Sequence, residues 1–230
     1  MANNIKDGTR LYLNITNKCN LKCEFCCMYS GPDKNRFMSF DVFKDIIDET
    51  DGNFELQLEG GEPLLHKNIF LFMEYAMSTN RCTKIIILTN GFLLDRLKNN
   101  FLNFANYHKV EMEFKISINY WLINEWLKTH SESFIEYLSK IAFSFKYHPY
   151  INIIFNVRKR KEDEWLDDEI KHYNIDKQSH IFYFQSYGRL SDSDEYEKPV
   201  IVQNIQNWHL YASDGTYFEQ DLIARSEYEK

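Results

Sequence analysis

Short apolar runs alternate with amphipathic segments along this chain of 230 residues. Six of the runs are rich in Ile, Leu, Val and Phe and have the length of strands that are buried on both faces. They cover residues 10–16, 53–63, 84–91, 110–119, 151–158 and 180–188. The segments between them repeat their apolar positions with a helical period, over residues 39–50, 68–80, 93–107, 121–147 and 162–173, of which 121–147 is one long helix or two. The pattern predicts six strands joined by helices, with Ser39 as the N-cap of the first helix.

Strands that alternate with helices in this way predict an α/β fold with a parallel sheet and right-handed crossovers. Six βα units are too few for a closed eight-unit barrel, so we expect a partial (β/α)6 barrel. Residues 208–224 break the rhythm and predict a short C-terminal β-hairpin around a Ser-Asp-Gly turn. We therefore expect a core domain over residues 1–190, followed by a linker and a capping hairpin over residues 191–230.

Composition and charge exclude several classes of protein. Hydrophobic residues make up 44% of the chain, with only 8 Gly and 4 Pro, which is typical of an ordered globular protein. The net charge is −7, and the one basic run, residues 158–161, is followed at once by acidic residues, so no nucleic-acid footprint is visible. No apolar run has the length of a signal-peptide core or a membrane span. We expect a cytoplasmic protein without membrane contact.

Four of the five cysteines lie within residues 19–27, in the stretch CNLKCEFCC. Cys19, Cys23 and Cys26 have the spacing C-x3-C-x2-C, which lets three thiolates converge on one inorganic centre. A structural zinc site and a closed iron–sulfur site each need a fourth ligand. Cys27 adjoins Cys26 and should point elsewhere, and Cys82 is expected to be a buried thiol. Three cysteines therefore indicate a cluster with one iron left open for a ligand, as in catalytic metal sites.

This motif resembles that of the radical S-adenosylmethionine (radical SAM) enzymes. The resemblance implies that Cys19, Cys23 and Cys26 hold a [4Fe–4S] cluster, with S-adenosylmethionine on the fourth iron. It extends over residues 10–190 through the GGEP sequence from Gly60, the LTNG turn, the ISIN strand end and the QSYGR segment. Besides the metal ligands, it implies these cofactor-binding residues: Phe25, Gly60, Gly61, Glu62, Asn90, Ser117, Asn119, Asn156 and Arg158.

Within this set, the resemblance places Phe25 against the adenine and Gly60–Glu62 at the amino group of S-adenosylmethionine. Asn119 departs from the family, in which many members have an aspartate at that position. The strand period puts Gln57 and Glu59 on one face, where they either line a substrate cavity or meet solvent at the strand end. Catalytic residues in the substrate cavity are not identified by the sequence.

Fold and cofactor do not determine the substrate. The GGEP, LTNG and QSYGR segments resemble the branch of peptide maturases and molybdopterin-type enzymes, so the leading interpretation is hydrogen abstraction from a peptide or protein side chain. The given sequence has no cysteine after Cys82, so we expect the auxiliary clusters of that branch to be absent. The alternatives are a small-molecule or nucleotide enzyme, an activase of a glycyl-radical enzyme, and a non-catalytic iron–sulfur or zinc protein. An external flavodoxin- or ferredoxin-like electron donor and a recognition partner protein are the expected partners.

Overall fold

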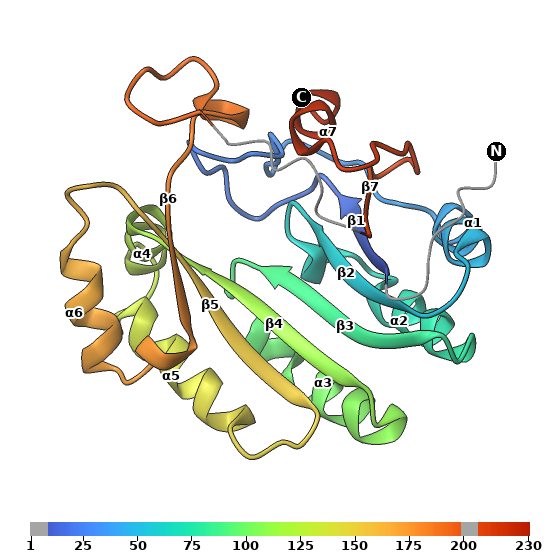
Figure 1. Cartoon of the computed structure of the whole chain (residues 1–230). Coiled ribbons are helices and arrows are strands. Elements are labelled where there is room, and N and C mark those ends of the chain that lie inside the picture. Colours follow the sequence, from blue (N-terminus) through green and yellow to red (C-terminus); the bar gives the residue numbers. More distant parts are fainter. Residues whose placement is uncertain (1–8, 199–206) are drawn as a thin grey trace. The chain divides into compact units, whose positions relative to one another are not determined.

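The computed structural model describes residues 9–198 and 207–230 and divides the chain into two compact units. The first unit is Met1–Leu88 together with Gln185–Lys230, and the second is Thr89–Phe184. Each unit combines parallel strands with helices (Figure 1). The end of the predicted linker, from residue 199, lies outside the described residues. The predicted domain boundary after residue 190 stays a prediction.

The first unit has the strand order β3-β2-β1-β7. These strands are β1 (Thr9–Thr16), β2 (Phe54–Gly60), β3 (Cys82–Thr89) and β7 (Trp208–Tyr211). The helices are α1 (Phe40–Glu49), α2 (Ile69–Ser78) and α7 (Leu222–Tyr228), with 3-10 turns η1 (Pro63–Leu65) and η3 (Gly188–Leu190). Leu11 is in register with Leu56 and Leu13 with Leu58, and all four side chains are fully buried. The apolar runs thus form the centre of this sheet, as their composition predicts.

Local sequence signals explain where α1 begins and which side it buries. The Ser39 hydroxyl accepts a hydrogen bond from the Val42 N–H at 3.2 Å, which confirms the predicted N-cap. One turn further on, Phe43 stacks on Phe72 of α2 with ring centroids 4.2 Å apart. This buried aromatic pair joins α1 to α2.

The second unit has the strand order β6-β5-β4. Its strands are β4 (Glu111–Ile118), β5 (Ile151–Lys159) and β6 (Ser179–Tyr183). Its helices are α3 (Leu94–His108), α4 (Tyr120–Leu127), α5 (Phe134–Phe145) and α6 (Trp165–His172), with the 3-10 turn η2 (Asp176–Gln178). The segment 121–147 forms two helices, because the Ser133 hydroxyl caps a new start by accepting from the Ile135 N–H at 3.2 Å.

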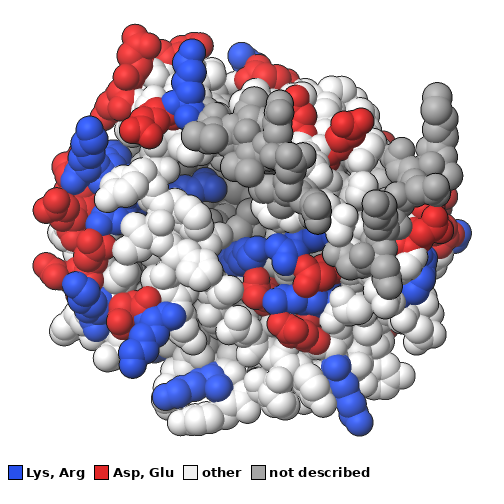
Figure 2. Space-filling model, in the orientation of Figure 1, with Lys and Arg blue, Asp and Glu red and all other residues white. Residues whose placement is uncertain are grey.

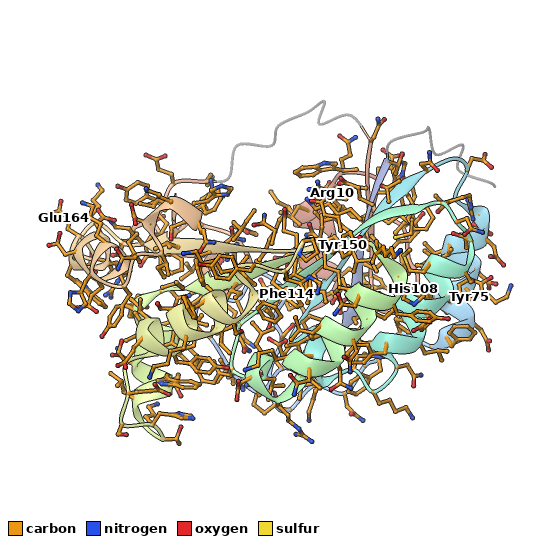
Figure 3. The ribbon with its side chains drawn as sticks, turned by 90° about the horizontal axis from the view of Figure 1, so that it is seen from below. Arg10, Tyr75, His108, Phe114, Tyr150 and Glu164 are labelled. Carbon is orange, nitrogen blue, oxygen red and sulfur yellow. The ribbon has the colours of Figure 1, made fainter. Side chains whose placement is uncertain are left out.

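Aromatic side chains fill the core of the second unit. Phe114 projects from β4 toward the helices (Figure 3). It meets Phe101 of α3 edge-on at 4.9 Å and stacks on Phe145 of α5 at 5.8 Å, and all three rings are buried. These contacts attach α3 and α5 to the strand that lies between them in sequence.

The predicted C-terminal hairpin is only partly present. The turn forms, because the Ala212 N–H donates to the Thr216 carbonyl at 2.9 Å and the Phe218 N–H donates to the Leu210 carbonyl at 2.9 Å. Only the first arm is a regular strand, however: β7 pairs in parallel with β1 and so extends the sheet of the first unit. The end of the expected second arm is instead helix α7, which begins at the N-cap Asp221. The free backbone edge of β1 explains why the first arm is drawn into the sheet.

The surface carries both signs of charge. Where side chains are described, Lys and Arg are interspersed with Asp and Glu on the face drawn in Figure 2. This face therefore has no continuous basic patch of the kind that nucleic acids bind. Within residues 9–198 and 207–230, the helices all fall short of the length and apolar character that crossing a membrane would require.

Candidate active site

The cysteine stretch forms the loop that follows β1. Cys19 is buried, whereas Cys23, Cys26 and Cys27 are half-buried. The Cys26 N–H donates to the Cys23 carbonyl at 3.2 Å, and the Leu21 N–H donates to the Cys19 sulfur at 3.4 Å. Hydrogen bonds to sulfur are one of the means by which proteins set the potential of iron–sulfur clusters. The local backbone therefore already supplies one such donor to the first cysteine.

Three of these thiols lie near one another. The pKa of Cys23 is raised, first by burial and then by the neighbouring Cys26 and Cys19 thiols. Among the described residues, no group of three or more His, Cys, Asp or Glu side chains is arranged to hold a single metal ion. In a [4Fe–4S] cluster each thiolate binds a different iron, so its cysteines stand further apart than the ligands of one zinc ion.

The turn after β2 lies against the start of the cysteine loop. The Gly61 N–H donates to the Thr16 carbonyl at 2.6 Å, and the Glu62 N–H donates to the Lys18 carbonyl at 2.8 Å. Gly60 has a φ of +135°, and a Cβ there would lie 2.2 Å from the Thr16 carbonyl oxygen. A Cβ on Gly61 would lie 2.2 Å from the Lys18 carbonyl oxygen. The two glycines are therefore required by the close approach of two strand ends, whether or not a ligand also approaches them.

Replacing Gly60 by alanine should lower the free energy of unfolding of the metal-free protein by at least about 2 kcal/mol, because both the backbone angle and the steric clash oppose a side chain. Gly31→Ala is the matched control in the same region, since its Cβ would come within 3 Å only of the movable Asp33 carboxylate, at 2.6 Å. Urea unfolding followed by circular dichroism measures both. Equal unfolding midpoints for the two variants would contradict this account of Gly60.

Glu62 is fully buried at the end of this turn. Its Oε1 accepts a hydrogen bond from the Leu64 N–H at 3.1 Å, which caps the 3-10 turn η1. Because its backbone N–H also holds the cysteine loop, Glu62 is fixed at both its main chain and its side chain. It is a rigid carboxylate close in sequence to the two glycines.

Gln57 and Glu59 share a face of β2, as the strand period predicts, but both are buried in a hydrogen-bond network. Gln57 Nε2 donates to Glu59 Oε2 at 2.5 Å, and Arg225 Nη2 of α7 lies 2.5 Å from Glu59 Oε1. Arg225 is itself 2% exposed and donates from Nη1 to the Tyr12 carbonyl at 3.3 Å. Neither of the two expected environments, an open cavity or solvent, describes Glu59. Its partner is a buried guanidinium 166 residues away in the sequence.

A second carboxylate of the C-terminal segment is buried near the end of β1. Glu229 is fully buried, and its Oε1 accepts from Asn14 Nδ2 at 2.6 Å and from the Ser213 N–H at 3.1 Å. Its Oε2 lies 3.7 Å from the half-exposed Arg36 guanidinium. The C-terminal segment therefore supplies buried contacts to β1.

The C-terminal segment also contacts the cysteine loop, which sequence analysis did not predict. The Ser226 hydroxyl of α7 donates to the Cys27 carbonyl, and the Tyr29 hydroxyl lies 2.8 Å from the Gly188 carbonyl. Figure 1 shows α7, in red, beside the blue loop that follows β1. The side chain of Arg189 bonds two carbonyls of this loop. The only sequence signal was the family resemblance of the QSYGR segment, which says nothing about its contacts.

The remaining predicted cofactor residues belong to the second unit and lie at or near its strand ends. Asn90 Oδ1 accepts from the Phe92 N–H at 3.1 Å in the turn after β3. Asn119 Oδ1 caps α4 by accepting from the Leu122 N–H at 2.9 Å. Ser117 of β4 is in register with Asn156 of β5, and Arg158 lies two residues further along β5. Phe25, in the first unit, is half-buried on the cysteine loop.

Sequence comparison finds curated relatives that match part of the chain. A probable GTP 3',8-cyclase from Methanocaldococcus jannaschii is 39% identical over 92 residues, which are 38% of this chain and 30% of that protein. A GTP 3',8-cyclase from a Synechocystis species is 34% identical over 91 residues, which are 38% of this chain and 28% of that protein. The matched region thus spans less than a third of either relative.

Solved structures resemble the chain over most of its length. Native anSMEcpe with bound AdoMet and the Cp18Cys peptide has a TM-score of 0.61 at 14% identity, covering 94% of this chain and 74% of that one. SuiB of Streptococcus suis bound to its precursor peptide SuiA has a TM-score of 0.58 at 14% identity, covering 84% of this chain and 43% of that one. At this identity the similarity concerns the fold, and it confirms the partial-barrel α/β architecture with parallel strands.

One family model matches the chain, and its range includes both the cysteine motif and the two glycines after β2. The model describes the radical SAM superfamily, whose members use a [4Fe–4S] cluster and S-adenosylmethionine, and it matches residues 13–167. That range is well over half of the 230 residues. The protein therefore belongs to the radical SAM superfamily.

Proposed function

We propose that this chain is a radical SAM enzyme whose cluster is held by Cys19, Cys23 and Cys26. The observation that carries the proposal is the convergence of three thiols on a loop tied by hydrogen bonds to the glycine turn after β2. When bound, the cluster and S-adenosylmethionine supply a 5′-deoxyadenosyl radical that abstracts hydrogen from a substrate. The role of the protein is to hold three thiolates, leave one iron accessible and position the cofactor.

We assign the cofactor contacts as the family resemblance implies. Gly60, Gly61 and Glu62 receive the amino group of S-adenosylmethionine, and the buried Glu62 carboxylate suits an ammonium group. Phe25, half-buried on the loop, receives the adenine. The second unit contributes polar candidates from its strand ends, of which Asn90 and Asn119 have side-chain oxygens bonded to local N–H groups. These candidates are Asn90, Ser117, Asn119, Asn156 and Arg158.

The substrate that we favour is a peptide or protein side chain. Two considerations support it: the QSYGR segment resembles peptide maturases, and the solved structures of similar fold include enzymes crystallised with peptides. A nucleotide substrate is the second candidate, because the curated relatives include GTP 3',8-cyclases. No feature of the described residues specifically favours an activase role or a non-catalytic role.

The proposal includes two accessory requirements. Reductive cleavage of S-adenosylmethionine needs one electron at a time, so we propose an external flavodoxin- or ferredoxin-like donor, and a recognition partner for the peptide. Iron–sulfur assembly needs reduced thiols, and none of the five cysteines is in a disulfide. We therefore propose that the protein works in the cytoplasm.

Reconstituted protein, reduced with dithionite in the presence of S-adenosylmethionine, should release 5′-deoxyadenosine and methionine, as chromatography with mass spectrometry would detect. Two further reactions separate the substrates: one with GTP, and one with a short precursor peptide if a neighbouring reading frame encodes one. Faster cleavage of S-adenosylmethionine in the presence of the peptide supports the favoured substrate. So does transfer of deuterium from a deuterium-labelled peptide into 5′-deoxyadenosine. The same transfer from labelled GTP favours the nucleotide. A reconstituted cluster that cleaves no S-adenosylmethionine would support the non-catalytic interpretation.

A further inference from the structure

The segment that enters η3 lies directly on the cysteine loop. Gly188 has a φ of +62°, and a Cβ there would lie 2.4 Å from the Cα of Cys27 and 2.7 Å from the Cys26 carbonyl oxygen. The next residue, Arg189, donates its backbone N–H to the Cys26 carbonyl at 3.1 Å. The glycine allows the two main chains to touch, and the arginine is thereby placed beside the loop.

The Arg189 side chain bridges two positions of the loop, at Cys23 and at Ser30. Its Nη1 donates to the Cys23 carbonyl at 2.6 Å, and its Nη2 donates to the Ser30 carbonyl at 2.7 Å. Together with the backbone bond to Cys26, Arg189 thus contacts the main chain of two of the three predicted cluster ligands. The planar guanidinium suits this task, because its donors are held in a fixed fork, whereas a lysine is a single flexible point charge.

The Arg189 guanidinium donates to backbone carbonyls. Among the ion pairs within the described part of the chain, none includes Arg189, although its side chain is half-buried. Its acceptors are neutral carbonyls, so its positive charge stays beside the cysteine loop. A [4Fe–4S] cluster on three thiolates is an anion and gains a further negative charge on reduction. Nearby charge and hydrogen bonding are among the factors that set the potential of such clusters.

We propose that Arg189 is a positioning residue of the cluster site: its fork fixes the loop that carries Cys23 and Cys26, and its charge stabilises the reduced cluster. The proposal rests on the proposed function, because it requires a cluster on this loop. It assigns a role to a residue outside the cysteine motif and far from it in the sequence.

The test compares three variants with the wild-type chain after anaerobic reconstitution: Arg189→Gln, Arg189→Lys and Arg81→Gln. Arg81 is the matched control, because it also donates from both Nη atoms to two backbone carbonyls, those of Ile47 and Thr50 at the end of α1. The readouts are iron and sulfide per chain, the electron paramagnetic resonance spectrum of the reduced cluster and its midpoint potential. None of these needs turnover. Unfolding of the metal-free proteins shows whether each variant is folded.

We expect Arg189→Gln to lose iron more readily than Arg81→Gln and to have a more negative midpoint potential than the wild type. Arg189→Lys should recover the wild-type midpoint potential, because it restores the positive charge. It should still lose iron faster than the wild type, because lysine lacks the two fixed donors of the guanidinium. An Arg189→Gln variant with wild-type iron content or with wild-type potential would overturn the proposal. A wild-type chain that assembles no [4Fe–4S] cluster would instead overturn the proposed function, so the two failures are distinguishable.

Discussion

Alanine in place of Cys19, Cys23 or Cys26 should reduce the iron content of the reconstituted protein from about four per chain to nearly none. Each of these thiolates would bind a separate iron, and the proposed ligand set has three members, so we expect no spare ligand to compensate for a loss. The absorption near 400 nm and the electron paramagnetic resonance signal of the reduced cluster should disappear together. Iron and sulfide analysis after anaerobic reconstitution measures the effect directly.

Cys27→Ala and Cys82→Ala are the controls for that experiment, and both should retain a full cluster. Cys27 lies outside the proposed ligand set, and its backbone carbonyl accepts from Ser226, a contact that alanine retains. Cys82 begins β3, and burial raises the pKa of its thiol to about 12, which keeps it neutral and a poor ligand. Loss of the cluster in Cys27→Ala, with survival in one of the other three, would show that the ligand set is wrong.

Much of the fold could be predicted because its signals are local. The run KIIIL became the buried part of β3, with Ile85, Ile86 and Ile87 all inaccessible to solvent. Ser39 capped its helix because a hydroxyl three residues before a free N–H is in reach whatever the rest of the chain does. The break within residues 121–147 was left open, since a second cap at Ser133 competes with a continuous apolar stripe.

The candidate site could be predicted only as far as its motifs are contiguous. Three cysteines on one loop and two glycines at a strand end carry their chemistry in their spacing. The role of the C-terminal segment cannot be predicted from spacing, because it depends on contacts between residues more than 150 positions apart. Arg189 bonds the Cys23 carbonyl across 166 positions, and the polar sequence around it is typical of solvated loops. Strand periodicity placed Glu59 on the right face but could not supply the charge that pairs with it.

Arg225→Ala should produce the largest loss of stability of the substitutions considered, about 3–5 kcal/mol in the free energy of unfolding. The Arg225 and Glu59 side chains are 2% and 8% exposed and lie 2.5 Å apart. Removal of the guanidinium leaves a buried carboxylate whose remaining side-chain partner, within the part of the chain that the structure describes, is Gln57. The lost free energy is the penalty for leaving a buried charge without a partner, and this penalty exceeds the net contribution of the ion pair to stability. Urea unfolding of the metal-free protein at neutral pH measures it.

Arg10→Ala is the matched control, because Arg10 also pairs with a glutamate of β2. Arg10 (labelled in Figure 3) and Glu55 are 25% and 31% exposed, so water screens both charges and the loss should be about 1 kcal/mol or less. A double variant, Glu59→Leu with Arg225→Met, should recover most of the stability, since it removes both charges and keeps the volume. If Arg225→Ala costs no more than Arg10→Ala, then Glu59 is not buried in solution, and the contact between α7 and β2 is absent there. If the double variant stays as unstable as Arg225→Ala, the loss comes from packing, and the charge argument fails.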